Sequence, residues 1–434
     1  MSKNCAVAFL IAIAGLFAAP AIAQDVHLGA KSCGSSGCHG QVASSGSPVL
    51  LNEYLTWTKY DKHSQSYAAL QSDQGKRIAA NLGIENATES DTCLNCHATN
   101  IKEEHRGPNF DIADGVSCEA CHGAGSGAWM GLHIGGSDHA TNVANGLTPV
   151  EDPIVRAGIC LDCHLGDEDQ FATHRIMGAG HPRISFELDS FTAFQPAHYA
   201  QDEDYAKRKN VVNGVKTWAI GQALAVERNM DLLLNSKYAS NGLFPELAFF
   251  DCHACHQPMS SSQNGSTSWV SRPGTGLGPG VAKFNDANML MLEIAVGMAN
   301  EGLAKQMADN IRALHKGTHT SKAAMTSAAE AVRATAQASV EALSAANIDG
   351  AAMQSAMSKL QGRSADGYFG DYKGAEQATM AMGAIIEAMR VAGFMDEAAY
   401  AEANTKMEKV YAAVGNDERF VRSSFISAVK ALNN

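Results

Sequence analysis

Cysteine pairs followed directly by a histidine recur at five places along this chain of 434 residues. Four of them read Cys-x-x-Cys-His, whereas the first, CGSSGCH, has four residues between its cysteines. In chain order, motifs 1 to 5 consist of Cys33, Cys38 and His39; Cys93, Cys96 and His97; Cys118, Cys121 and His122; Cys160, Cys163 and His164; and Cys252, Cys255 and His256. With only 16 histidines in the chain, chance would produce this pattern with a probability on the order of one in ten million.

Cys-x-x-Cys-His is the attachment pattern of a c-type haem, in which two thiols add to the porphyrin vinyl groups and the next histidine binds the iron. The sequence therefore predicts five covalent haems c. The ten motif cysteines are their attachment points, and the five motif histidines are their proximal iron ligands. In motif 1 the residues between the cysteines are glycine and serine, which are small and flexible enough to bulge so that both thiols still reach one porphyrin.

Zinc and disulfides are the alternative uses of paired cysteines. Two Cys-x-x-Cys pairs can close a tetrahedral zinc site, but zinc does not require a histidine behind every pair, and five pairs do not divide into four-ligand sites without remainder. Disulfides across a Cys-x-x-Cys loop are strained and reducible. For motif 1 a Cys33–Cys38 disulfide stays open as an alternative, and it would leave four haems.

A haem that only carries electrons needs a second axial ligand on its iron, and eleven of the 16 histidines are not proximal ligands, one of them, His253, lying inside motif 5. His63 lies in a predicted helix over residues 52–70, beside aromatic residues that suit packing on porphyrin. His133 follows motif 3 after the small residues of GAGSGAWMGL. His174 and His181 flank RIMGAG, where glycines and a following proline disfavour a continuous helix, so we expect these two distal ligands at different irons.

The other histidines outside the motifs are weaker candidates. His27, His105 and His139 are reserve distal ligands. His315 and His319 lie far from any motif, and we expect them to be solvated surface residues.

The first 23 residues have the pattern of a cleaved secretory signal peptide: one lysine, an apolar run, and Ala-Ile-Ala before Gln24. A retained membrane anchor is the alternative interpretation of the same apolar run. We therefore expect an exported protein, periplasmic or on the cell surface. The formal net charge of −12 argues against nucleic acid or an anionic membrane surface as a partner.

Composition divides the rest of the chain into three segments. Residues 24–258 contain all five motifs, and we expect a haem domain with little regular structure, a haem-rich core and one scaffold helix over 211–237. Residues 259–284 are rich in Ser, Gly and Pro, which predicts a linker. Residues 285–434 show helical periodicity with Ala and Met stripes, which predicts an α-helical bundle. The predicted fold class is mainly α.

The chain resembles the multihaem c-type cytochromes, and specifically those related to the tetrahaem cytochrome c of nitrifying bacteria and, more distantly, hydroxylamine oxidoreductase. The resemblance rests on EYLTWTKYDKHSQSYAAL, SCEACHG and CLDCHLGDEDQFATHRIMGAGHPRISFELDSF, within about residues 28–260. It implies covalent haem c, export and electron transfer between closely spaced haems. It also supports His198 as the fifth distal ligand, more than spacing does.

We favour a non-enzymatic carrier that passes electrons between redox proteins of a respiratory chain, such as quinol-oxidising or terminal reductase and oxidase partners. An alternative is an oxidoreductase acting on nitrite, hydroxylamine or a sulfur oxyanion at one open haem, for which HRIMGAGHPR supplies two histidines and two arginines. No Cys-x-x-Cys-Lys variant supports that enzyme. A second alternative is a subunit of an extracellular cytochrome filament. The bundle could cover the haem domain, dock a partner or form a homo-oligomer.

Mass spectrometry of the purified holoprotein tests the number of haems. We expect the mass of five covalently attached haems in the wild type, and four in the double variant Cys33→Ser/Cys38→Ser. A wild type with four haems, unchanged in the variant, would instead support the Cys33–Cys38 disulfide.

Overall fold

The computed structural model describes residues 25–42, 49–239, 245–256, 273–278 and 281–432. The predicted signal peptide lies outside these residues. The fold is mainly α, as predicted from the sequence. In the described part of the chain, extended pairing is limited to two isolated bridges, His27 with Arg106 and Phe250 with Phe284. A search of the same residues found no helix with the length and apolarity needed to cross a membrane.

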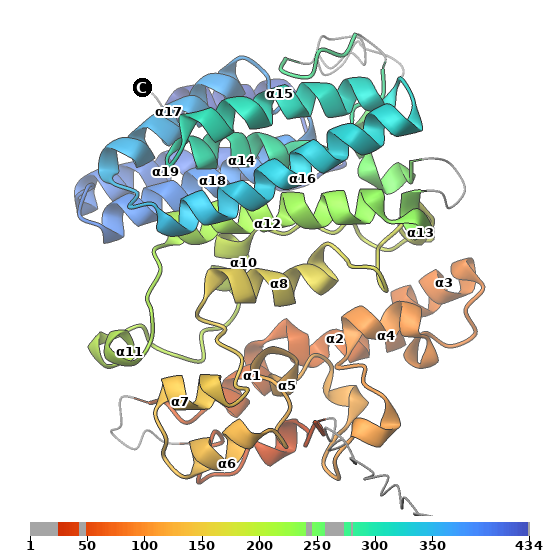
Figure 1. Cartoon of the computed structure of the whole chain (residues 1–434), viewed down its shortest axis with the longest axis vertical. Helices are drawn as coiled ribbons and strands as arrows, with labels where there is room; N and C mark the ends of the chain where they lie inside the picture. Colours follow the sequence, from red (N-terminus) through yellow and green to blue (C-terminus); the bar gives the residue numbers. More distant parts are fainter. Residues whose placement is uncertain (1–24, 43–48, 240–244, 257–272, 279–280, 433–434) are drawn as a thin grey trace, which may run out of the picture.

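Short helices and 3-10 turns make up the N-terminal part, drawn in red to yellow-green in Figure 1. The helices are α1 (Glu53–Tyr60), α2 (Ser66–Gln71), α3 (Asp73–Leu82), α4 (Asp91–His97), α5 (Cys118–His122), α6 (Ala128–Ile134), α7 (His139–Ala144), α8 (Pro153–His164), α9 (His174–Gly178), α10 (Leu188–Phe194) and α11 (Glu203–Arg208). The 3-10 turns of this part are η1 (Ala30–Ser32), η2 (Lys62–Gln65), η3 (Ala87–Glu89), η4 (Glu103–His105) and η5 (Ile112–Asp114), whereas η6 (Leu247–Phe249) and η7 (Cys252–Ala254) come later in the chain. The apolar cluster beside motif 2 is small: Leu70, Ala79, Ala87, Leu94 and Ala98.

The predicted helix over residues 52–70 is wrong as one continuous element. Helix α1 ends at Tyr60, Asp61 is extended, and the chain continues through η2 into α2. The carboxylate of Asp61 accepts a hydrogen bond from the backbone N–H of His63 at 3.0 Å. An aspartate that bonds a nearby backbone amide in this way competes with helical hydrogen bonding, which explains the break. His63 therefore lies in a tight turn.

The C-terminal helices pack around one large apolar core in the upper part of Figure 1. They are α14 (Ala287–Gly297), α15 (Glu301–Thr318), α16 (Lys322–Ala345), α17 (Gly350–Ala365), α18 (Tyr372–Val391), α19 (Glu397–Ala413) and α20 (Arg422–Leu432). Alanine and methionine positions form much of this core, as the periodicity predicts.

Helix α12 (Gly214–Leu234), followed by the short α13 (Ser236–Ala239), also belongs to this core. Its residues Trp218, Val226 and Met230 are fully buried, and it packs against α14, α16 and α18. The sequence analysis assigned this helix to the haem segment, so the predicted boundary at residue 258 does not follow the packing. Helices α8 and α10 lie between α12 and the N-terminal helices (Figure 1).

A buried group of charges joins motif 5 to the bundle. The ammonium of Lys283 lies 2.6 Å from carboxylates of both Asp286 and Asp371, and Asp286 also bonds the Nε2 atom of His315 at 3.0 Å. Burial by itself would lower the pKa of Lys283, but the two carboxylates raise it above its ordinary value. Burial would likewise raise the pKa of Asp286, yet Lys283 and His315 hold it at about 2. The backbone N–H of Asp251, the residue before motif 5, donates to the carbonyl of Lys283 at 2.9 Å and so links the motif to these charges.

This junction corrects two expectations from the sequence. His315 is only 1% exposed and is not a surface residue, because it lies in the core with its Nε2 atom bonded to the carboxylate of Asp286, whereas His319 is exposed as expected. The linker predicted over 259–284 falls partly outside the described residues, and its last residues, Lys283 and Phe284, are buried. The buried ring of Phe284 and the ion pairs of Lys283 hold this part of the chain in place, so it does not act as a linker.

Helix α18 makes the second connection between the bundle and the N-terminal part. The guanidinium of Arg183 forms two hydrogen bonds with the carboxylate of Glu376, at 2.9 and 3.0 Å, and stacks over the ring of Tyr372. The hydroxyl of Ser185 donates to the same carboxylate at 2.6 Å. This fixes the segment that follows His181 against the bundle.

Replacing Lys283 with methionine tests whether the buried charges hold the two parts together. Because two buried carboxylates would lose their counter-charge, we expect the free energy of unfolding to fall by about 3–5 kcal/mol. Urea unfolding of the holoprotein, followed by far-ultraviolet circular dichroism, measures it. The control Lys359→Met removes an exposed ion pair with Glu301 and should change stability by less than about 1 kcal/mol. Equal effects of the two substitutions would contradict a structural role for the junction.

Candidate haem sites

The five motifs lie on short elements that present their cysteines and histidine together. Motif 2 forms most of α4, motif 3 is α5, motif 4 ends α8, and motif 5 begins with η7. Cysteines three residues apart on a helix lie on one side of it, with the next histidine beside the first cysteine. Motif 1 lies in a loop after η1, where Cys38 is exposed. All ten motif cysteines are free thiols, the groups that would carry the thioether bonds of haem c.

Each motif histidine lies opposite one further histidine. The distances between ring centroids are 5.8 Å for His39 and His133, 6.3 Å for His97 and His181, 6.2 Å for His122 and His198, 6.2 Å for His164 and His63, and 6.0 Å for His256 and His174. The five partners are the five histidines that the sequence analysis selected as distal candidates. His174 and His181 lie at different motifs, and α9 ends at Gly178 between them.

These separations can be compared with the geometry of a metal held by two imidazoles. Two metal–nitrogen bonds of about 2.0–2.1 Å, extended by the radius of each ring, put the ring centroids about 6 Å apart. All five pairs fit that spacing. Of the reserve candidates, His139 has a different partner, because its Nε2 atom lies 2.5 Å from the carboxylate of Glu151.

Four of the paired rings are held through their Nδ1 atoms. His39 bonds the Glu53 carboxylate at 3.0 Å, and His63 bonds the Asp61 carboxylate at 2.9 Å. The ring of His97 bonds the carbonyl of Ser66 at 3.0 Å, and the ring of His181 bonds the carbonyl of Pro182 at 2.8 Å. A hydrogen bond donated from Nδ1 fixes the tautomer and leaves Nε2 to bind a metal.

Sequence reasoning did not identify the two carboxylates. The signal for Asp61 is the Asp-x-His turn, in which its side chain reaches both the backbone and the ring of His63. Burial would raise the pKa of Asp61, but hydrogen bonds from His63 and Gln195 hold it at about 2. Burial would raise the pKa of Glu53, the first residue of α1, but the hydrogen bond and charge of His39 together with backbone hydrogen bonds lower it below its ordinary value. Nothing local in the sequence links Glu53 to His39.

The rings of His122 and His164 are neutral in this environment. Burial, with a smaller contribution from the facing imidazole of His198 or His63, lowers the pKa of both to about 4. A neutral imidazole is the form that binds a metal, so these positions are suited to ligation near pH 7.

Contacts between motif cysteines show which motifs are neighbours. The thiols of Cys33 and Cys118 share a hydrogen bond that lowers the pKa of the first and raises that of the second. A second such pair joins the thiols of Cys96 and Cys163. Motif 1 therefore adjoins motif 3, and motif 2 adjoins motif 4.

Two further contacts connect these pairs of motifs. Burial raises the pKa of Cys160 to about 12, with a further contribution from the thiol of Cys121, so motif 3 also adjoins motif 4. Helix α9 begins with His174, at motif 5, and is followed by His181, at motif 2. The motifs are therefore connected in the order 1, 3, 4, 2 and 5.

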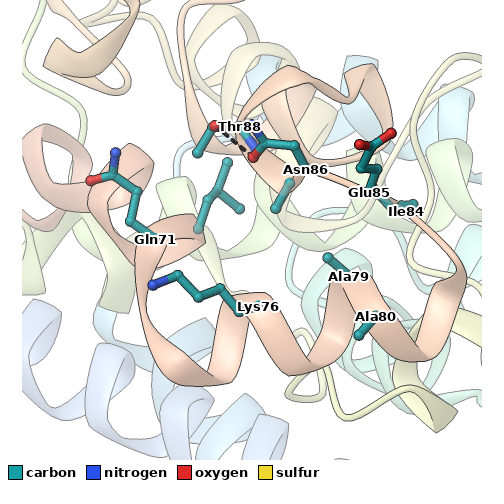
Figure 2. A pocket seen from close by; sticks show the side chains of 10 residues that line it. Gln71, Lys76, Ala79, Ala80, Ile84, Glu85, Asn86 and Thr88 are labelled. Carbon is teal, nitrogen blue, oxygen red and sulfur yellow. Dashed lines mark hydrogen bonds between the residues drawn. The ribbon is translucent and has the colours of Figure 1, made fainter.

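The pocket in Figure 2 does not supply a second site. It has a volume of about 420 Å³ and is lined by residues of α2, α3 and the segment that leads into η3. Lys76 and Glu85 are its charged residues, and no cysteine or histidine lines it. It therefore lacks the groups on which haem attachment or iron ligation depends.

Comparison with known families gives one match. Residues 33–123, which include motifs 1 to 3, match the family Cytochrome c554 and c-prime. No curated protein and no solved structure matches the chain. The match covers less than half of the chain, and it supports a c-type cytochrome with a haem-based electron-transfer role.

Proposed function

We propose that this chain is an exported pentahaem cytochrome c that transfers electrons between redox proteins along closely spaced haems. The observation that carries the proposal is the facing of each motif histidine by one further histidine, with ring centroids 5.8–6.3 Å apart. With haem attached to the cysteines, each pair would hold an iron from both sides and leave it no open position. Covalent haem c supplies one-electron chemistry, and the chain supplies spacing, axial ligation and burial.

The ligand set of the proposed cytochrome is complete. His39, His97, His122, His164 and His256 are the proximal ligands, and His133, His181, His198, His63 and His174 are the distal ligands. Export rests on the signal peptide expected from the sequence. The relation to the nitrifier tetrahaem cytochrome and to hydroxylamine oxidoreductase rests on the resemblance, whereas the family match over residues 33–123 supports a c-type cytochrome.

Electrons follow the order of adjoining motifs, from motif 1 through 3, 4 and 2 to motif 5 or in reverse. The thiol contacts between motifs 1 and 3 and between motifs 2 and 4 support this order, as does the electrostatic interaction of Cys121 in motif 3 with Cys160 in motif 4. Cys38 and Cys255 are the exposed cysteines of the set, and they belong to the two terminal motifs. Redox partners therefore dock at these two ends, where a quinol-oxidising protein and a terminal reductase or oxidase would exchange electrons.

Contacts of the segment HRIMGAGHPR argue against an enzyme with an open haem. Its histidines, His174 and His181, lie opposite motif histidines. The guanidinium of Arg175 donates to a backbone carbonyl of α3, and Arg183 pairs with Glu376. The charge of Arg183, which could otherwise hold an oxyanion, is thus already neutralised by Glu376 of the bundle.

Electron paramagnetic resonance of the oxidised protein should resolve two classes of low-spin haem. The ring planes are nearly parallel for His39 with His133, at 8°, and for His256 with His174, at 25°. The other three pairs cross at 81–87°. Crossed ligand planes leave two iron d orbitals nearly equal in energy and give highly anisotropic signals. We expect three signals of that kind and two ordinary rhombic ones, and five signals of a single class would contradict the ring geometry.

Adding nitrite or hydroxylamine to the oxidised protein separates a carrier from an enzyme. Because every iron would have two histidine ligands, we expect all five low-spin signals to stay unchanged. The variant His198→Ala is the positive control, since it opens the iron at motif 3 and should create a high-spin signal that responds to the added ligand. A ligand-sensitive high-spin signal in the wild type would overturn the carrier and favour the oxidoreductase.

A further inference from the structure

The five pairs of facing histidines differ in what holds their Nδ1 atoms. At motifs 1 and 4 one ring of the pair bonds a carboxylate, from Glu53 and Asp61 respectively. At motif 2 both rings bond neutral backbone carbonyls. At motifs 3 and 5, whose paired rings are His122 with His198 and His256 with His174, no ring hydrogen bond to a carboxylate or carbonyl is found among the residues that the structure describes. The acceptors thus divide the motifs into three groups.

The two carboxylates flank the same helix. Glu53 is the first residue of α1, and Asp61 is the residue that ends it. Each is held in place by a second contact: Glu53 accepts the backbone N–H of Leu51 at 3.1 Å, and Asp61 accepts the side-chain amide of Gln195 at 2.9 Å. Asp61 is only 4% exposed. Neither carboxylate is free to turn away from its imidazole.

A carboxylate on Nδ1 changes the electronic character of the imidazole. It draws the Nδ1 proton toward itself, so the Nε2 atom becomes a stronger donor to a bound metal. A stronger donor stabilises the ferric iron relative to the ferrous iron and lowers the reduction potential. A neutral carbonyl has the same effect more weakly, because hydrogen bonds to a charged acceptor are the stronger ones.

We propose that Glu53 and Asp61 are positioning residues that make the haems of motifs 1 and 4 the hardest of the five to reduce. This inference rests on the bis-histidine ligation proposed above. Along the path 1, 3, 4, 2, 5 it places a haem of higher potential between the two of low potential. The haems of motifs 3 and 5 are then reduced first.

A redox titration followed by electron paramagnetic resonance tests the inference, because the two haems differ in class. The pair at motif 1 has nearly parallel rings, whereas the pair at motif 4 has rings crossed at 87°. In the wild type we expect the two lowest potentials to belong to one rhombic and one highly anisotropic signal. Two lowest potentials within one class would overturn the proposal without any variant.

The variants Glu53→Gln and Asp61→Asn separate charge from orientation. Their amide oxygens can still accept the Nδ1 hydrogen bond, so the rings keep their places while the charge is lost. We expect each to ease reduction of one haem by roughly tenfold, which is 59 mV for one electron. Glu53→Gln should shift a rhombic signal and Asp61→Asn an anisotropic one. A shift shared by all five haems, or no shift, would contradict the proposal.

Asp152→Asn is the matched control. Asp152 caps α8, the helix of motif 4, through the backbone N–H of Ile154, and asparagine caps a helix equally well. The potentials should stay unchanged. If Asp61→Asn yields no mature protein, Glu53→Gln and the wild-type titration decide the matter. Fewer than five haems, or a high-spin signal, would instead overturn the proposed ligation. Five low-spin haems whose potentials do not change in either variant would overturn only this inference.

Discussion

Two imidazoles facing each other across each motif are the constraint on which the N-terminal part depends. The members of a pair come from separate elements, as with His63 in η2 and His164 at the end of α8. A metal bound by both would cross-link those elements, and metal binding of this kind contributes directly to folding free energy. The apolar cluster beside motif 2 consists of five small or medium side chains, so it offers little stability without such cross-links. We infer that haem and fold are inseparable here.

The bundle differs from the N-terminal part in the source of its stability, which is an apolar core formed by protein side chains alone. Trp218 of α12 and Phe284 are fully buried in that core. Its connections to the haem part are polar and specific: Lys283 with its two carboxylates near motif 5, and Arg183 with Glu376 after His181. A body with its own apolar core thus fixes the two segments that present His181 and motif 5. The bundle therefore helps to set ring geometry at motifs 2 and 5.

The pairing of motif histidines with further histidines was the part of this molecule that the sequence could anticipate. Covalent spacing is local, so the cysteines and proximal histidines can be identified without a fold, and the same five histidines proposed as distal partners lie opposite them. Non-local packing was not predictable in this way. His315 looked like a surface residue because its partner, Asp286, lies on another helix, and α12 looked like part of the haem segment because its core partners follow much later. The break at Asp61 depended on side-chain competition with the helix.

Helix α1 would link the potentials of the haems proposed at motifs 1 and 4. Glu53 is the first of its eight residues and Asp61 directly follows the last, so the two carboxylates can reach His39 and His63 only if the helix keeps both its length and its position. Trp57, in the middle of α1, donates to the carbonyl of Val116, which directly precedes the motif 3 segment. One short helix therefore contacts the surroundings of motifs 1, 3 and 4 together. Inserting or deleting a residue in α1 would rotate one carboxylate away from its ring. The length of this helix is therefore constrained by the reduction potentials of the proposed haems as well as by packing.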